Sequence, residues 1–542
     1  MKSIHSDGSF ALNVILCVAG ALLKAILWLP GALAGVALIS YAYYPEFALE
    51  LLQGIANRDA ATITGLLVQT ILICAWISMA FSFLTCKPCN TCDEALYQLA
   101  NACQRLLKQA RHYAKKALSS FNRPNVAQLG LDETVSYGAP DASGAVIGGI
   151  NGKPLIDTSM LPVAVLGKER SGKTCSFIVP TLLTWKGSAI VTDARGETYE
   201  ITAGWRKSCA NNRIRCIAFC DPESPDTFNF LDAIPWGSED ESSATRHLAR
   251  LMLDDFAPLE DFDKQCTVSI AVVLLALVIQ NVHQVFQTHA SLHHAWQFIS
   301  AGPHSLETMI TMVIDDAQSA MTQSDIKLLS LCLKNKDIER RAREAVLSSL
   351  CAFRYPEVAR NTSTSTFSLR ELNEEGSKIT VYLNYSPRNA AEAFPLIRIF
   401  TGLVIASRQS TDIYGRLLLA LDDFSVSGCA RLMNFTMPDL VSRNIKPAIT
   451  FQHLEDTSLG AIWKKCPIRS VLQVINYETA ELVSRELSGA SPVSGQAFTS
   501  QDIMRLDEEE AIIVGCSEQP FQASTYPYYK DVAMLAKQGG SL

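Results

Sequence analysis

The spacing of hydrophobic residues changes along the chain, and each change predicts a different kind of structure. Residues 25–44 and 62–84 are two apolar runs of about twenty residues each, the length that a helix needs to cross a membrane. Residues 93–117 show helical periodicity and many basic positions, which predicts a stem helix within a connecting segment, 93–145. From residue 146 onward, short apolar runs that end in polar residues alternate with helical segments. This alternation predicts an α/β fold with a doubly wound, mostly parallel sheet.

The sheet pattern is interrupted between residues 238 and 365, where long helical runs replace the strand signals. We therefore expect an all-helical domain inserted between two parts of the sheet domain, residues 146–237 and 366–542. The most apolar of these runs, "SIAVVLLALVIQNV", has a second interpretation as a third membrane span. It holds only about ten consecutive apolar residues and has charged neighbours, so a buried helix is favoured.

The two N-terminal runs predict a transmembrane hairpin in residues 1–92. A cleaved signal peptide is the alternative for the first run, but no small-residue cleavage site follows it at the usual distance, and a second run comes soon after. Lys and Arg residues cluster between 87 and 123, whereas the loop between the runs offers only Arg58. The positive-inside rule therefore predicts a cytoplasmic N-terminus and a cytoplasmic C-terminal body.

Composition supports a membrane part joined to a globular body, since 48% of the residues are hydrophobic. The net charge of −7 excludes a molecule that is basic overall, so any contact with nucleic acid needs a local patch. Most of the 16 cysteines lie in apolar runs, which indicates reduced thiols and a cytosolic body. Cys86, Cys89 and Cys92 have a spacing that permits a metal site, but no His lies nearby, and juxtamembrane thiols without a special role remain the alternative.

A glycine-rich loop, "GKERSGKT", fits the phosphate-binding pattern GxxxxGKT and lies between a predicted strand and a predicted helix. This context weakens the alternative of a chance match. Lys173 would contact the β and γ oxygens of ATP, and the Thr174 hydroxyl would bind Mg²⁺, while backbone amides of residues 168–174 face the phosphates. The predicted nucleotide-binding residues are Gly167, Lys168, Glu169, Arg170, Ser171, Gly172, Lys173 and Thr174.

A pair of carboxylates ends a later hydrophobic strand, "LLLALDDF". Asp422 would hold Mg²⁺, and Asp423 would orient and polarise the attacking water. An Asp pair that merely closes a strand is the alternative, and it is weaker when a glycine loop precedes it in the same sheet. Gln452, at the end of the next strand, is placed to sense the γ-phosphate or to position water.

The chain resembles the type IV secretion coupling proteins, the TraG-like inner-membrane ATPases. The most specific stretch is "SAIVTDARGETYEITAGWR", whose Asp193, Gly196 and Glu197 match the strand-end Asp and the Gly–Glu pair of that family. The resemblance extends from the membrane hairpin to about residue 500. The other segments that carry it, in order, are "GAVIGGINGKPL", "VLGKERSGKTCSFIVPTLLTW", "FNFLD", "KITVYLNYSP", "LLLALDDF", "ITFQHLED" and "NYETAELVSRELSG".

This resemblance implies a RecA-like P-loop NTPase, anchored in the bacterial inner membrane with its large domain in the cytoplasm and assembled as a homo-hexamer. It implies partners among the inner-membrane components of the secretion system, and a relaxase with its DNA, bound without sequence specificity, or effector proteins. It also implies an arginine finger from the neighbouring subunit, at the position of Arg443, which the sequence alone would treat as a surface base. One departure is Asp423, where the family usually has Glu, and this puts the hydrolysis rate in question.

Three functions are compatible with these features. The leading one is an ATP-driven motor that recruits DNA or proteins to a type IV secretion channel. The second is a double-stranded DNA translocase of the chromosome-segregation type, although such proteins generally carry more membrane spans and an added DNA-reading domain. The third is a receptor scaffold that binds nucleotide but hardly hydrolyses it, which the shorter side chain of Asp423 keeps open.

Overall fold

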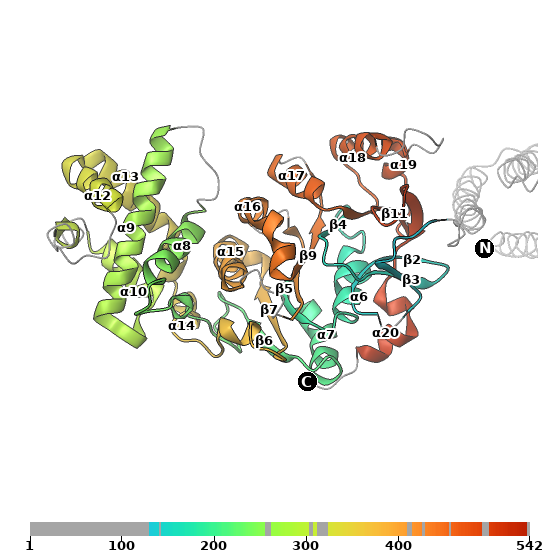
Figure 1. The fold of residues 1–542 in the computed structure, drawn as a ribbon, viewed down its shortest axis with the longest axis horizontal. Helices are drawn as coiled ribbons and strands as arrows, with labels where there is room; N and C mark the ends of the chain where they lie inside the picture. The colour runs from blue at the N-terminus through green and yellow to red at the C-terminus, as the bar shows by residue number, and fades with distance from the viewer. Residues whose placement is uncertain are drawn as a thin grey trace, which may run out of the picture. The chain divides into compact units, whose positions relative to one another are not determined.

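The computed structural model describes residues 129–538, apart from the segments 140–141, 255–261, 303–306, 312–322, 409–414, 425–428, 455–456 and 490–497. The predicted transmembrane hairpin, most of the predicted segment 93–145, and Cys86, Cys89 and Cys92 lie outside the described residues. The described chain, shown in colour in Figure 1, belongs to a single unit that spans residues 124–542.

A twelve-stranded sheet forms the centre of this unit. One part is parallel and has the spatial order β10 (Ile468–Val471), β4 (Val163–Leu166), β9 (Ile445–Phe451), β8 (Leu417–Leu421), β5 (Ser188–Ala194), β7 (Ile379–Tyr385) and β6 (Arg213–Ile217). The other part is antiparallel and continues from β10 through β11 (Glu510–Val514), β12 (Phe521–Ser524), β2 (Ala145–Ile150), β3 (Lys153–Asp157) and β1 (Val135–Tyr137).

Both faces of the parallel part are buried, which explains why its strands are continuous apolar runs. In β8, Leu417, Leu419 and Leu421 join one hydrophobic core, whereas Leu418 and Ala420 join another on the opposite face. Successive side chains of a strand point to opposite faces, so a strand between two helical layers must be apolar at every position.

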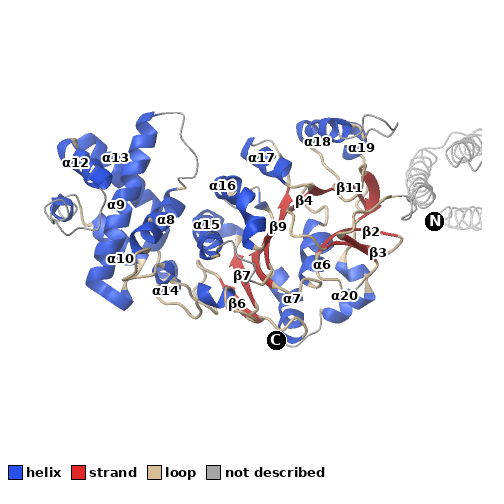
Figure 2. Cartoon of the chain, in the orientation of Figure 1, coloured by secondary structure: helices blue, strands red, loops and turns tan. Residues whose placement is uncertain are grey.

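Helices cover the two faces of the sheet, as Figure 2 shows. One face carries η2 (Thr174–Ile178), α6 (Val179–Leu182) and α7 (Glu197–Ser208). The other carries α15 (Ala390–Ser407), α16 (Ala430–Leu440), α17 (Thr457–Lys465), α18 (Tyr477–Gly489) and α19 (Ser500–Met504). The C-terminal elements η10 (Tyr528–Lys530) and α20 (Val532–Lys537) follow β12. The prediction of an α/β fold is therefore confirmed, but the sheet is mixed rather than mostly parallel, since an antiparallel part extends it beyond β10.

Between β6 and β7 the described elements are helical, as predicted. They are η3 (Phe230–Ala233), α8 (Glu241–Leu253), α9 (Phe262–Phe286), η4 (Gln287–His289), α10 (Leu292–Ser300), α12 (Gln323–Lys334), α13 (Lys336–Ser349), η5 (Cys351–Arg354), α14 (Pro356–Asn361) and η6 (Leu369–Leu372). The exact bounds of an inserted domain, 238–365, remain a prediction.

Two described helices are long and apolar enough to cross a membrane, Lys264–His289 and Pro387–Ser407. In the structure, however, 61% of the most apolar window of the first and 56% of that of the second are buried within the protein. The first includes Ile270 to Ile279, all core positions packed among α8, α10, α12 and α13. Its apolar character is thus accounted for by burial in the helical segment, in agreement with the predicted buried helix.

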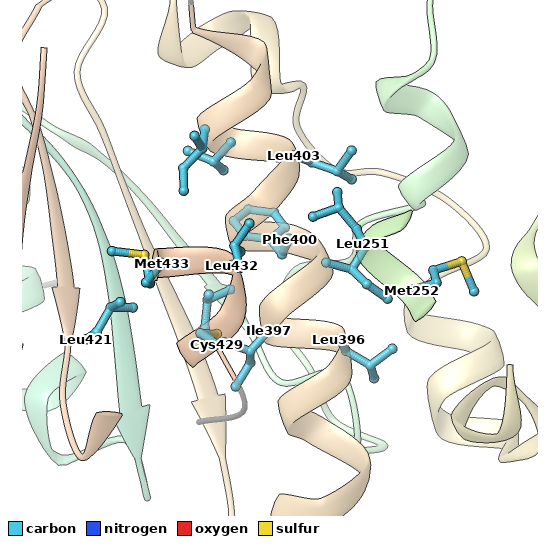
Figure 3. Packing of buried hydrophobic residues seen from close by; sticks show 14 of the residues in the cluster. Leu251, Met252, Leu396, Ile397, Phe400, Leu403, Leu421, Cys429, Leu432 and Met433 are labelled. Atoms are coloured by element: carbon cyan, nitrogen blue, oxygen red, sulfur yellow. The ribbon is translucent and has the colours of Figure 1, made fainter. Parts of the chain in front are cut away.

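The helical segment joins the sheet domain through α15. Figure 3 shows Leu396, Ile397, Phe400 and Leu403 of α15 between residues of α8 on one side and of β8 and α16 on the other. The labelled partners are Leu251 and Met252 of α8, Leu421 of β8, and Cys429, Leu432 and Met433 at the start of α16. One continuous core therefore extends from the sheet into the helical segment.

Candidate nucleotide-binding site

The glycine loop connects β4 to η2 and turns sharply at its two glycines. Gly172 has φ +85°, in the left-handed region that favours glycine. A Cβ atom at Gly167 would lie 2.5 Å from the Ser171 hydroxyl and 2.9 Å from Leu472 Cβ. Larger residues at either position would disturb the loop, so the pattern of glycines has a direct steric cause.

Some backbone amides of the glycine loop donate hydrogen bonds to the protein, and others are available to a ligand. The amides of Gly167 and Lys168 donate to Phe451 and Gln473 carbonyls, at 3.0 and 2.9 Å, and the Ser171 amide donates to the Lys168 carbonyl at 3.2 Å. The sequence predicts that all amides from residue 168 to residue 174 face the phosphates. In the structure, the amides of Lys168 and Ser171 are instead bonded to carbonyls of the protein. Residues 172–174 lie at the N-terminal end of η2, where the backbone amides have no acceptor within the helix. These amides are therefore suited to bind an anion.

Lys173 is buried and points back into its own loop. Its Nζ donates to the carbonyls of Gly167 and Lys168, both at 2.9 Å. Burial lowers the pKa of Lys173, whereas the nearby carboxylates of Asp423, Asp422 and Glu169 act in the opposite direction. The ammonium is thus held at the centre of the loop by neutral acceptors, which anionic phosphate oxygens would outcompete.

Thr174 and Asp422 meet although they are 248 residues apart in the chain. The Thr174 hydroxyl donates to Asp422 Oδ2 at 2.5 Å, and the Thr450 hydroxyl donates to Asp422 Oδ1 at 2.6 Å. Burial, and then the adjacent Asp423 carboxylate, raise the pKa of Asp422, while these two hydrogen bonds lower it. Thr174 and Asp422, both predicted from the sequence to bind Mg²⁺, are therefore in direct contact in the structure.

Asp423 lies beside this pair on a strained backbone. Its φ of +49° is unusual for a residue with a side chain, and the conformation is held because its amide donates to Asp422 Oδ1 at 3.1 Å and to Thr450 Oγ1 at 2.9 Å. Gln452 Nε2 donates to Asp423 Oδ1 at 3.0 Å. The structure thus brings Asp423 and Gln452 together.

Two threonines hold this arrangement, and neither was predicted from the sequence. Thr450 is on β9 and contacts both carboxylate residues. Thr192, on β5, accepts the Asp422 amide at 2.8 Å and donates to the Asp422 carbonyl at 3.2 Å. The signal that points to them is a polar residue near the C-terminal end of an otherwise apolar strand, in "AIVTD" and "AITFQ". Because parallel strands end at one edge, these hydroxyls converge with the carboxylates.

Asp193, singled out by the family resemblance, lies near the end of β5 and binds amides in the first turn of α7. It is buried and accepts the amides of Thr198 and Tyr199 at 3.2 and 2.8 Å. Burial raises the pKa of Asp193 to about 6, against the effect of these two bonds. Arg206, at the end of the same stretch, is buried and donates to the Leu182, Trp185 and Gly187 carbonyls. The most specific stretch of the resemblance therefore fixes α7 against the sheet.

Arg443 is not brought to this site within the chain. It lies just before β9, whereas Gln452 follows the other end of β9, and a strand of seven residues spans about 20 Å. Arg443 Nη1 donates to the carbonyls of Arg408 and Ile405 at the end of α15, at 2.7 and 3.3 Å. Its role as an arginine finger for a neighbouring subunit remains a prediction.

The residues present fit a magnesium ion bound together with a nucleotide. Thr174 and Asp422 supply a hydroxyl and a carboxylate, the hard oxygen donors that Mg²⁺ prefers. Among the described residues there is no group of three or more His, Cys, Asp or Glu residues that could hold a metal by itself. Magnesium is usually bound by one or two protein ligands plus phosphates and water, so this sparse donor set suits it.

Comparison with solved structures supports the fold. Plasmid coupling protein TrwB in complex with ADP and Mg²⁺ matches with a TM-score of 0.53 at 12% identity, over 72% of this chain and 91% of TrwB. The unbound monoclinic form of TrwBdeltaN70, a bacterial conjugative coupling protein, matches with a TM-score of 0.53 at 14% identity, over 72% of this chain and 89% of that one.

Comparison of sequences identifies relatives. Conjugal transfer protein TraG of Escherichia coli is 27% identical over 402 residues, which is 68% of this chain and 62% of TraG. Protein VirD4 of Rhizobium radiobacter is 26% identical over 278 residues, 49% of this chain and 38% of VirD4. The matched part thus spans less than two thirds of either relative. Residues 148–496 match the family model described as type IV secretory system conjugative DNA transfer. Since this match covers more than half of the 542 residues, the chain belongs to the type IV secretory system conjugative DNA transfer family.

Proposed function

We propose that the chain is an ATP-driven motor that delivers relaxase-bound DNA, protein effectors or both to a type IV secretion channel. The observation that carries the proposal is the meeting of Thr174, Asp422, Asp423 and Gln452 beside the glycine loop, in a chain of this family. The names of its relatives support the proposal, because TraG is a conjugal transfer protein and TrwB a plasmid coupling protein.

The proposed cofactors are ATP and Mg²⁺. TrwB has been solved with ADP and Mg²⁺ and with the ATP analogue ADPNP. In this chain, the amides of residues 172–174 and the Lys173 ammonium would bind the phosphates, and Lys173 would exchange its two carbonyl partners for phosphate oxygens. Thr174 and Asp422 would hold the ion, which neutralises charge on the β- and γ-phosphates.

Hydrolysis would depend on Asp423 and Gln452. The Asp423 carboxylate would orient water and accept its proton, while Gln452 donates a hydrogen bond to one of its oxygens. The same hydrogen bond favours a second candidate function, a nucleotide-binding receptor scaffold with little turnover, because it occupies an oxygen of an already short side chain. The two functions differ in the rate of phosphate release, which can be measured directly.

We further propose that the chain assembles as a homo-hexamer at the inner membrane, with the hairpin of residues 1–92 as its anchor and the body in the cytoplasm. The uneven distribution of Lys and Arg around the two apolar runs supports this orientation. A reporter fused after Gly152 should behave as cytoplasmic, and a periplasmic signal from that fusion would overturn the orientation.

The central experiment compares the detergent-extracted wild-type chain with Lys173→Ala in ATP binding, steady-state ATP turnover with and without DNA, and cargo transfer. We expect Lys173→Ala to fold and insert but to lose binding, turnover and transfer. Lys207→Ala is the matched control, since Lys207 is an exposed lysine on α7 outside the loop. Wild-type turnover by Lys173→Ala would show that the glycine loop is not the nucleotide site. Binding without turnover in the wild type would favour the scaffold.

A further inference from the structure

Next to the glycine loop lies an aromatic surface that no part of the proposed phosphate chemistry uses. The C-terminal turn η10 packs against η2, the helical turn that begins at Thr174. Within η2, the residue next to Tyr528 and Tyr529 is Cys175, which follows Thr174 in the chain. Burial and the adjacent Cys175 thiol raise the pKa of both Tyr528 and Tyr529, as expected for two phenols next to this thiol.

This surface lies close to the nucleotide site. The γ-phosphate side of the site is marked by Asp422 and Gln452, which come from β8 and β9 on one side of β4. On the other side of β4 lie β10, β11 and β12, and η10 follows β12 in the chain. The position of η10 in space is set by its packing against η2, the turn that follows the glycine loop, so η10 lies next to a nucleotide bound by that loop.

The two rings offer a face on which a planar base can stack. The Tyr529 side chain is 50% exposed although its turn is packed on the protein. The Tyr528 and Tyr529 rings meet edge to face, with centroids 5.6 Å apart and an interplanar angle of 81°. Tyr528 thus packs on the ring of Tyr529, and because Tyr529 is half exposed, part of its ring stays accessible to a ligand.

The turn is held in place, so the rings are pre-organised. The Asp531 amide donates to the Tyr528 carbonyl at 3.2 Å, and Lys530 pairs with Glu509 at 2.9 Å. Farther along, Met534 packs in a core cluster with Val179 and Leu183 of the helical layer behind the loop. An ordered ring loses less entropy when a ligand stacks on it.

We propose that Tyr529, supported by Tyr528 and adjoining Cys175, forms the base-binding face of the nucleotide site and stacks on the purine. This inference rests on the proposed nucleotide-binding function and adds to it the residues that hold the nucleoside. It predicts that the polyphosphate and the base are bound by separable groups, the glycine loop and η10.

The test uses the full-length chain in detergent and two ligands, Mg·ATP and Mg·tripolyphosphate, with dissociation constants measured by equilibrium dialysis and competition. Stacking of a base on an aromatic side chain contributes about 1–3 kcal/mol, so Tyr529→Ala should raise the Kd for ATP by roughly 5- to 150-fold. The Kd for tripolyphosphate should stay unchanged. Tyr529→Phe keeps the ring and should bind ATP nearly as the wild type does.

Two controls separate this inference from the proposed function. Phe435→Ala removes a ring that is also exposed, 64%, but lies on α16, and should change neither Kd. Lys173→Ala should weaken both ligands. Unchanged ATP binding by Tyr529→Ala, with loss in Lys173→Ala, would overturn the base-binding face and leave the nucleotide site intact. Equal weakening of ATP and tripolyphosphate by Tyr529→Ala would also overturn it, since the turn would then only support the loop. Full ATP binding by Lys173→Ala would refute the proposed function itself.

Discussion

Replacing Thr450 by valine tests whether one hydroxyl on β9 holds the two carboxylate residues in position. Thr450 Oγ1 donates to Asp422 Oδ1 at 2.6 Å and accepts the Asp423 amide at 2.9 Å. The side chain is 0% exposed, and valine has nearly the same shape and suits a strand. Thr450→Val therefore removes both hydrogen bonds while it leaves the packing of β9 in place.

The expected loss follows from these contacts. A hydrogen bond to a charged group contributes about 1.5–3 kcal/mol to stability. The Asp423 amide keeps Asp422 Oδ1 as a second acceptor at 3.1 Å, so it is not left without a partner and adds little to the cost. We expect a loss of about 2–3 kcal/mol, which lowers Tm by roughly 2–4 °C in a body of this size.

The same substitution should impair the site beyond its effect on stability. The Thr450 hydrogen bond lowers the pKa of Asp422, so its removal raises that pKa further and favours the protonated acid, which binds Mg²⁺ poorly. Asp423 also loses one of the two acceptors that hold its left-handed backbone. We expect ATP turnover to fall and its Mg²⁺ requirement to increase, most strongly at low pH.

The assay combines thermal unfolding with steady-state turnover at several Mg²⁺ concentrations and pH values. Thr401→Val is the matched control, because Thr401 is also 0% exposed, on α15, but its hydroxyl has no hydrogen-bond partner among the described residues. That substitution should leave Tm unchanged or raise it, and turnover should not change. If both valine variants behave alike, or if Thr450→Val keeps the wild-type Mg²⁺ dependence, then Thr450 does not position the carboxylates.

Three further predictions concern the same site. Asp423→Asn should bind Mg·ATP but fail to hydrolyse it, whereas Asp423→Glu should keep or increase turnover; normal phosphate release by Asp423→Asn would exclude this carboxylate as the base. Arg443→Ala should bind ATP without hydrolysing it. Mixing this variant with Lys173→Ala should restore part of the activity, since one subunit supplies the intact pocket and the other supplies an arginine that increases the rate roughly 10³- to 10⁵-fold. Mixed oligomers that show no rescue would argue against an arginine finger. The pKa of Asp193 is raised from 3.8 to about 6, so the folded state binds a proton more tightly than the unfolded state does. This residue therefore stabilises the fold most below pH 3.8, and its contribution is lost as pH rises through 6. The Tm of Asp193→Asn should fall less than that of the wild type between pH 5 and pH 7.5, and parallel curves would contradict this.

Much of the sheet was predictable because its strands are buried on both faces. Apolar runs such as "LLLAL" and "VAVL" appear in the sequence as uninterrupted hydrophobic segments, and each became a strand of the parallel part, β8 and β4. The glycine loop and the Asp pair were predictable for a related reason. Polar residues that follow a buried strand must lie at the edge of the sheet, where ligands bind.

The order of the strands and the supporting residues could not be predicted in the same way. Hydrophobic spacing reveals that a strand exists but not which strand it pairs with, so the place of β9 between β4 and β8 emerges only in the fold. Thr192 and Thr450 have the composition of ordinary strand residues, and their role depends on that order. Tyr529 is far from the loop in sequence, and no local pattern connects it to Cys175. Likewise, a sequence cannot show that Arg443 lies at the far end of β9 from Gln452.

The place of β9 has a consequence for how subunits of a ring would communicate. Its C-terminal end carries Thr450 and Gln452, which touch the carboxylates, and its N-terminal end adjoins Arg443. If Arg443 completes the pocket of the next subunit, a single strand connects the pocket that senses a γ-phosphate with the arginine offered to the neighbour. Because β9 is hydrogen-bonded to β4 on one side and to β8 on the other, a displacement caused by phosphate release at one end would be carried toward the other end together with these strands. Because the strand has a direction, such a signal would travel round the ring one way only, and the firing order of the subunits would follow from the polarity of β9.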